Sequence, residues 1–150
     1  MMKKILILIL TYCICMQTST ANEDIIEGVR LARDNTDFAV VISYTRLETE
    51  KIEISENYYE QKTIYYADII EKIRGNFSNK TSLSFYAWSE SGDSVGLPIQ
   101  DKLIFLCKDQ DNLFYFAGPG SSFIADPRYV YIAKQEKREL TGETTVQFCN

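Results

Sequence analysis

The clearest hydrophobic pattern in the chain is a run of five apolar residues, 103–107, with polar residues on both sides. Residues 100–102 precede the run and residues 108–112 follow it, and both flanks consist of charged and turn-forming side chains. A short apolar run bounded in this way is typical of a strand that is covered on both faces. We therefore predict that residues 103–107 form the central strand of a β core.

Several further segments have the alternation, or the β-branched and aromatic content, that is typical of strands. They are residues 38–44, 51–55, 81–88, 113–117 and 123–125. Within 81–88, Leu83, Phe85 and Ala87 share one face, whereas Tyr86 and Trp88 share the other. A tight turn at residues 111–112 would join the central strand to residues 113–117 as a hairpin.

Helical spacing marks the segment that follows residue 21. Ile25, Ile26 and Val29 recur as on one helix face, which predicts a short helix over residues 23–33. The charged stretch 134–142 is compatible with a second, C-terminal helix. Residues 63–74 are ambiguous, because their apolar side chains fit either one face of a helix that ends at Gly75 or a long strand.

The first 21 residues have the pattern of a secretory signal peptide. Lys3 and Lys4 form a basic start, residues 5–16 are apolar, and residues 19–21 resemble a cleavage site with small residues. The apolar run is shorter than the about 20 residues that span a bilayer. We therefore expect cleavage after Ala21, a secreted or periplasmic location, no membrane attachment after leader removal, and a single domain over residues 22–150.

The charge of this domain limits the partners that it can bind. Without the two leader lysines the net charge changes from −5 to −7. An acidic chain is a poor partner for nucleic acid, whose binding requires clustered Lys and Arg, and for an anionic membrane surface. A protein partner is compatible with this charge.

Two of the four cysteines, Cys107 and Cys149, lie beyond the leader. An oxidising compartment favours a disulfide bond between them. The alternative is a buried thiol at Cys107 and a free thiol near the C-terminus.

The order of these segments resembles the OB-fold domain of tissue inhibitors of metalloproteinases and the wider netrin-like group. Residues 68–75 are similar to that group's strand ending in Lys-Gly, and residues 102–106 are similar to its apolar central strand. The resemblance covers residues 37–126. It implies a mainly β fold, an OB-like closed or partly open β-barrel with a short N-terminal helix, in which residues 63–74 are a strand.

The resemblance does not extend to the chemistry of those inhibitors. They bind the protease zinc through an N-terminal cysteine, whereas Asn22 stands at the expected mature start and no cysteine lies near it. Residues 100–101 also replace the family's glycine before the central strand. The resemblance therefore implies the barrel and not the inhibition of a zinc protease.

Residue types that carry common catalysis are scarce. The chain has no histidine, which removes His-based triads, Cys–His pairs and the commonest metal ligand. Residues 118–122 lack the nucleophile-elbow spacing and predict a β-turn. The nearest acid pairs for a glycosidase are Glu90 with Asp93 and Asp109 with Asp111, and both fall in expected turns. We expect no catalytic residues, no cofactor and no metal site.

Tyr86 and Trp88 are the candidate partner-binding residues, because they project away from the predicted core. Such a pair on a sheet face is suited to contact with protein or sugar, unless the helix or the tail covers it. We expect a non-catalytic binding protein, such as an inhibitor or immunity factor acting on another envelope or extracellular protein. The alternatives are a carboxylate-dependent hydrolase of cell-wall glycan and a structural envelope component.

Overall fold

The computed structural model describes residues 22–55, 58–90, 96–138 and 148–149. The signal peptide expected over residues 1–21 lies outside this part of the chain. Within the described segments, no helix is both long enough and apolar enough to cross a membrane.

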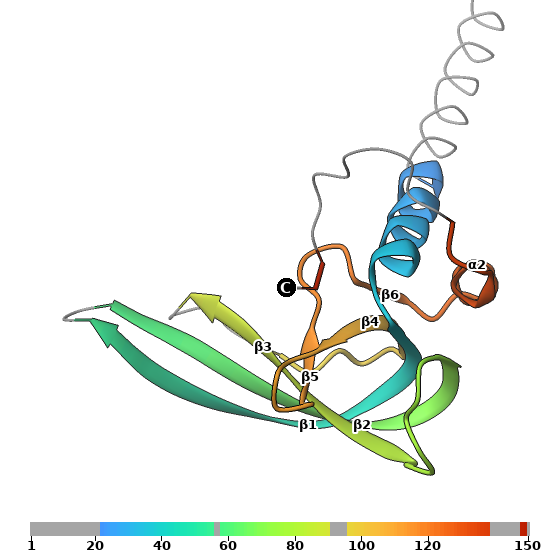
Figure 1. Cartoon of the computed structure of the whole chain (residues 1–150). Coiled ribbons are helices and arrows are strands. Elements are labelled where there is room, and N and C mark those ends of the chain that lie inside the picture. The colour runs from blue at the N-terminus through green and yellow to red at the C-terminus, as the bar shows by residue number, and fades with distance from the viewer. Residues whose placement is uncertain (1–21, 56–57, 91–95, 139–147, 150) are drawn as a thin grey trace, which may run out of the picture.

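The fold is mainly β, with one helix before the strands and one after them (Figure 1). Residues 22–35 are helical, close to the expected 23–33. The later elements are β1 (Phe38–Ser55), β2 (Tyr58–Arg74), β3 (Ser82–Glu90), β4 (Lys102–Lys108), β5 (Phe114–Phe116), β6 (Ser122–Ile124) and α2 (Pro127–Lys134).

Five strands form a ring of pairings. β1 pairs with β2, β2 with β3, β3 with β5, β5 with β4, and β4 pairs back with β1, while β6 adds to β4. A five-stranded ring of this order is an OB-like barrel, as expected. The parallel β3–β5 pairing has only two residue pairs, Phe85 with Phe114 and Tyr86 with Tyr115. The barrel is therefore partly open at this seam.

Strand β4 is covered on both faces, which confirms the expectation for residues 103–107. Ile104 and Leu106 point into the barrel and pack with side chains of β1, β2 and β3. Leu103, Phe105 and Cys107 point outward and pack under the two helices. All five side chains are buried. The unbroken apolar run thus reflects two separate cores that share one strand.

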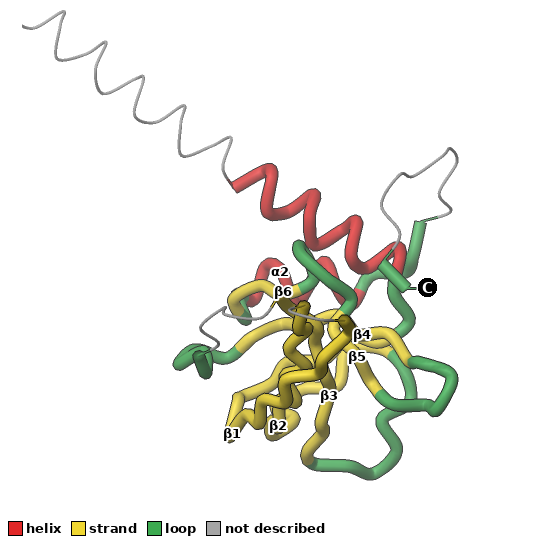
Figure 2. Tube along the Cα trace, turned by 90° about the vertical axis from the view of Figure 1, so that its left-hand side faces the viewer, coloured by secondary structure: helices red, strands yellow, loops and turns green. Residues whose placement is uncertain are grey.

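Both helices lie on the same side of the strands (Figure 2). Val29 and Ala32 of the N-terminal helix and Tyr129 and Ile132 of α2 belong to the core on the outer face of β1 and β4. From β2, Ile73 packs against this core at the end of the strand, whereas no described residue of β3 belongs to it.

The segment 63–74 is strand, and the helical alternative is wrong. It belongs to β2, which pairs with β1 on one side and with β3 on the other. Ladder hydrogen bonds on both sides satisfy the backbone groups of β2 without a helix. Periodicity could not distinguish the two states because isoleucine and tyrosine suit both a buried strand and a helix face.

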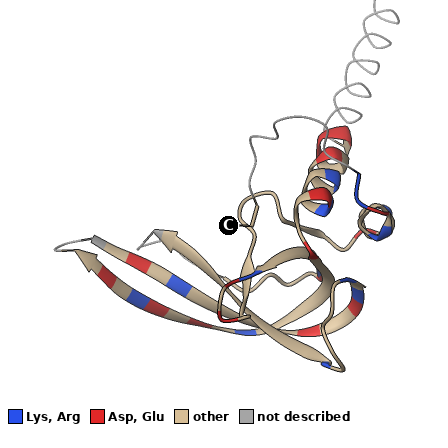
Figure 3. Ribbon diagram, viewed as in Figure 1, with Lys and Arg blue, Asp and Glu red and all other residues tan. Residues whose placement is uncertain are grey.

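Strands β1 and β2 form one long hairpin, longer than the two separate segments expected for β1. β1 pairs with β4 only through Phe38–Ile42 but follows β2 as far as Ser55. The outer parts, residues 47–55 and 58–66, extend away from the barrel body as a projecting arm (Figure 1). Acidic and basic positions are interspersed along this arm (Figure 3), which discourages edge-to-edge association.

The C-terminal helix lies earlier than the expected stretch 134–142. Asp126 caps α2 by accepting a hydrogen bond from the Arg128 backbone N–H, and Pro127 occupies the first turn. These are standard helix-start signals. Residues 135–138 are not helical, and 139–142 lie outside the described residues.

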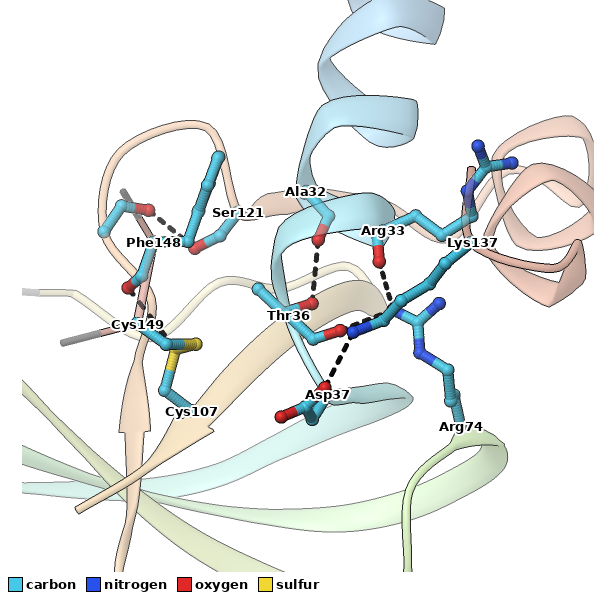
Figure 4. Close-up of a disulfide and its surroundings, with 11 residues drawn as sticks. Ala32, Arg33, Thr36, Asp37, Arg74, Cys107, Ser121, Lys137, Phe148 and Cys149 are labelled. Atoms are coloured by element: carbon cyan, nitrogen blue, oxygen red, sulfur yellow. Dashed lines mark hydrogen bonds and ion pairs between the residues drawn. A yellow bond between two sulfur atoms is a disulfide. The ribbon is translucent and has the colours of Figure 1, made fainter. Parts of the chain in front are cut away.

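A disulfide bond joins Cys107 to Cys149, as expected, with a Cα–Cα distance of 5.6 Å. It ties the C-terminal tail to the end of β4, one residue before Lys108 (Figure 4). A disulfide is compatible with an oxidising compartment.

Candidate functional site

A row of exposed and partly buried side chains crosses three neighbouring strands on the outer side of the barrel. Lys62 of β2 is the register partner of Trp88 in β3, and Tyr86 in β3 is the partner of Tyr115 in β5. We call these four residues the aromatic face. Because alternate residues of a strand point to opposite sides, Leu83 and Phe85 are buried in the barrel while Trp88 is 49% exposed.

The rings of the aromatic face contact one another. The Tyr86 centroid lies 6.3 Å from that of Trp88, edge to face, and 5.9 Å from that of Tyr115. The Lys62 Nζ lies 4.5 Å from the Tyr86 centroid and 5.7 Å from the Trp88 centroid. These distances are within the range of cation–π attraction. The face therefore presents three aromatic rings and one positive charge.

Asp109 holds the aromatic face in place from the β4–β5 turn. Its Oδ2 accepts a hydrogen bond of 2.9 Å from the Tyr86 hydroxyl. Its Oδ1 accepts two more, each 2.9 Å, from the backbone N–H groups of Asp111 and Leu113. Asn112 adopts a positive φ of 62°, and its N–H donates to the Asp109 carbonyl at 3.0 Å, which closes the expected hairpin turn.

These contacts set the ionisation of both partners. Burial raises the pKa of Tyr86 to about 12, and the hydrogen bond to Asp109 adds to this effect. The Leu113 backbone N–H, together with the Tyr86 hydroxyl, holds the pKa of Asp109 below its ordinary value. At neutral pH the tyrosine is therefore a neutral donor and the aspartate a charged acceptor.

Tyr86, Trp88 and Tyr115 line a shallow hollow of about 460 Å³ together with residues 109–111. The expected acid pair Asp109 and Asp111 thus lies beside the aromatic face. The other pair is not tested, since Asp93 is outside the described residues. Ser121 is buried, and its hydroxyl donates to the Gly118 carbonyl at 2.6 Å, so that residues 118–121 form the expected turn.

A second, larger cavity opens on the inner side of the same strands, at the mouth of the barrel. This mouth cavity has a volume of about 610 Å³ and is lined mainly by apolar side chains of β1, β2, β3, β5 and the C-terminal tail. The largest of these are Tyr44, Tyr65, Phe85, Trp88, Phe116 and Phe148. Trp88 and Tyr115 border both the mouth cavity and the hollow of the aromatic face.

Sequence reasoning found Tyr86 and Trp88 but missed the residues that the barrel brings to them. Lys62 lies in β2 and Tyr115 in β5, so only the strand pairing places them beside β3. The mouth cavity was missed for the same reason. The tyrosines within its strands, such as Tyr44 and Tyr65, are the one feature of the sequence that could have indicated it. Among the described residues, no group of three or more His, Cys, Asp or Glu side chains could hold a metal ion.

No protein-family model matches the chain, and neither a curated protein nor a solved structure is similar enough to count as a match. The residues and their geometry are therefore the basis for the proposals that follow.

Proposed function

We propose that this chain is an exported, non-catalytic binding protein that recognises another protein through the aromatic face and the adjoining β4–β5 turn. The sharper form of the proposal is an inhibitor or immunity factor that acts on an enzyme in the same compartment. The observation that carries it is the exposed Trp88, which is packed against Tyr86 and Lys62 and does not belong to the core under the two helices.

The composition and rigidity of the aromatic face support this proposal. Tryptophan and tyrosine are the residues that most often dominate the energy of protein interfaces. The Tyr86 hydroxyl is already held by Asp109, and the Tyr86 ring is packed between Trp88 and Tyr115. A partner would therefore meet a surface that loses little side-chain freedom on binding.

The ionisation and the hydrogen bonds of Asp109 support a protein-binding role for this surface rather than catalysis by carboxylates. A glycosidase needs one acid with a raised pKa to protonate the leaving group. Asp109 has a lowered pKa, and both of its oxygens accept hydrogen bonds from the turn and from Tyr86. Its chemistry is that of a structural anchor for the aromatic face.

The resemblance of residues 37–126 to the netrin-like group remains part of this proposal. OB-like barrels bind their ligands through a sheet face and the neighbouring loops. The aromatic face likewise lies on a sheet face, formed by β2, β3 and β5, next to the β4–β5 turn.

The test is capture of a partner from an envelope extract on the immobilised chain, with Trp88→Ala compared to Tyr131→Ala. Tyr131 is a matched control, because it is an exposed aromatic residue, 66% accessible, on α2 at the helical side. A hot-spot residue contributes about 2 kcal/mol, so Trp88→Ala should weaken capture about 30-fold. Tyr131→Ala should leave capture unchanged.

An extract that yields no specifically bound protein would overturn the proposal, as would equal losses in the two variants. If the captured protein is an enzyme, the inhibitor form predicts that its activity falls when the wild-type chain is added. If the enzyme activity does not change, the chain is a binding protein and the inhibitor form of the proposal is wrong.

A further inference from the structure

We propose that the mouth cavity binds an uncharged, largely apolar small molecule that carries one or two hydrogen-bonding groups. The cavity shares Trp88 and Tyr115 with the aromatic face but opens on the other side of the strands, and its ligand would be a small molecule, so this inference does not depend on the proposed function. It concerns a second ligand of different chemistry.

The size of the mouth cavity is that of a small-molecule site. Its volume of about 610 Å³ lies within the range of roughly 300–1,000 Å³ that is usual for ligand pockets. A partner's single side chain would leave much of this space unfilled. A compact organic molecule would fill it and remove more apolar wall from water.

One wall of the cavity is a continuous aromatic surface. Tyr65 and Phe85 are register partners in β2 and β3, and their rings are stacked with centroids 5.3 Å apart and planes inclined by 18°. Tyr44 from β1 meets the Tyr65 ring edge-on at 5.5 Å. Such a surface favours an apolar body that can lie flat against it.

The side chains that line the mouth cavity favour an uncharged ligand. Among the described residues that line the mouth cavity, none is Lys, Arg, Asp or Glu. An ionised group placed there would lose its water without gaining a counter-charge.

The polar side chains among the described lining residues carry hydroxyl groups and one indole N–H. Burial raises the pKa of Tyr44 to about 12. Burial also raises the pKa of Tyr65 above its ordinary value. The neutral groups that a ligand could meet are the hydroxyls of Tyr44, Tyr65 and Ser122 and the indole N–H of Trp88. A ketone, hydroxyl or amide on the ligand would match them.

The wall opposite the strands is held in place covalently. Phe148 lines the cavity and precedes Cys149, which is bonded to Cys107 of β4. The Cys107 Sγ lies 3.3 Å from the Phe148 carbonyl oxygen, beside Ser121 of the neighbouring turn (Figure 4). The disulfide therefore restricts the position of Phe148 before a ligand arrives, which lowers the cost of binding.

The test uses two fluorescent probes of similar shape and different charge. N-phenyl-1-naphthylamine is neutral, whereas 8-anilino-1-naphthalenesulfonate adds a negative charge to the same ring system. Trp88 is the single tryptophan of the chain and borders both the cavity and the aromatic face, so that excitation of Trp88 reports a probe bound at either, and the variants described next assign the probe to the cavity. We expect one neutral probe per chain, quenching of Trp88, and at least tenfold weaker binding of the anionic probe.

A cavity-filling variant localises the binding. Ala87 lines the mouth cavity on β3, so Ala87→Leu should occupy part of the space and weaken the neutral probe at least tenfold. Ser84→Leu adds the same side chain to the same strand at an exposed position outside the cavity, and should change probe affinity less than twofold. Ala87→Val serves as a milder filling if Ala87→Leu does not fold, which circular dichroism will show.

Equal affinity for the two probes, absence of Trp88 quenching, or equal effects of Ala87→Leu and Ser84→Leu would overturn the inference. A chain that binds the neutral probe in this way but captures no protein would overturn the proposed function alone. A chain that captures a Trp88-dependent partner and binds no probe would overturn the cavity ligand alone.

Discussion

At the residue scale, the most unusual feature of the described chain is a buried ion pair at the end of the N-terminal helix. Arg33 Nε donates to Asp34 Oδ1 at 2.7 Å and Arg33 Nη2 donates to Asp34 Oδ2 at 3.1 Å, with both side chains almost inaccessible. Arg138 donates to the same carboxylate through its backbone N–H and its Nε, each at 3.2 Å. Asp34 thus connects two segments that are far apart in sequence.

We expect Asp34→Asn to lower the free energy of unfolding by about 3–5 kcal/mol, because it leaves the Arg33 charge buried without its counter-charge. Urea unfolding measures this loss. Asp37→Asn is the control: Asp37 pairs with Lys137 at 2.7 Å but its side chain is 80% exposed, so its removal should cost at most about 1 kcal/mol. Equal losses in the two variants would contradict the role given to Asp34.

The same residue predicts an acid-sensitive component of stability. Burial alone would raise the pKa of Asp34, but the hydrogen bonds from Arg33 and Arg138 outweigh it and place the pKa below the ordinary 3.8. The stabilisation is therefore present above about pH 4 and is lost as the pH falls through the lowered value. Asp34→Asn should lose this part of the acid dependence, which unfolding curves between pH 2 and 5 will show.

At the element scale, Gly75 ends β2 and allows the chain to turn toward β3. Its φ of +92° lies in the left-handed region. A Cβ at this position would overlap the Phe38 ring and lie 3.0 Å from the Asp37 carbonyl oxygen. The adjacent Arg74 donates from Nη2 to the carbonyls of Arg33 and Thr36, at 2.7 and 3.1 Å, and so connects the strand end to the helix end (Figure 4).

Gly75→Ala should destabilise the protein by about 2–4 kcal/mol, from the left-handed backbone and from the clash with Phe38. Gly96→Ala is the matched control, because an added Cβ there meets nothing within 4 Å. Thermal unfolding compares the two variants. A Gly75→Ala protein as stable as the wild type would show that the β2–β3 connection can relax at this point.

At the scale of the whole molecule, one covalent bond joins the barrel to the C-terminal tail. Cys107 and Cys149 are 42 positions apart, and the bond fixes Phe148 against the mouth cavity. Closing a loop of this length lowers the conformational entropy of the unfolded chain, which raises its free energy by about 4 kcal/mol relative to the folded state. The bond therefore affects both global stability and the wall of the proposed ligand site.

Removing the bond with Cys107→Ala and Cys149→Ala together should lower the free energy of unfolding by about 4 kcal/mol. Dithiothreitol should destabilise the wild type by a similar amount and leave the double variant unchanged. Urea unfolding with and without the reductant measures both effects. A wild type that is insensitive to full reduction would contradict a stabilising role for the bond.

Features that depend on neighbours in sequence were predicted from the sequence alone. The central strand 103–107, the alternation of 81–88, the N-terminal helix and the turns at 111–112 and 118–121 follow from local side-chain preferences and periodicity. The cysteine pair was predicted because only two of the four cysteines lie beyond the expected signal peptide. The burial of Asp34, in contrast, could not be predicted from its neighbours in sequence, because it depends on Arg138, which lies 104 positions away.

Only the tertiary structure decided which strands meet. Residues 63–74 are strand because β1 and β3 flank them, and Lys62 and Tyr115 join Tyr86 and Trp88 because β2 and β5 flank β3. The mouth cavity likewise combines β1, β2, β3, β5 and the tail. Side-chain alternation assigns a residue to a face of its own strand, but closure of the barrel determines which residues of other strands share that face.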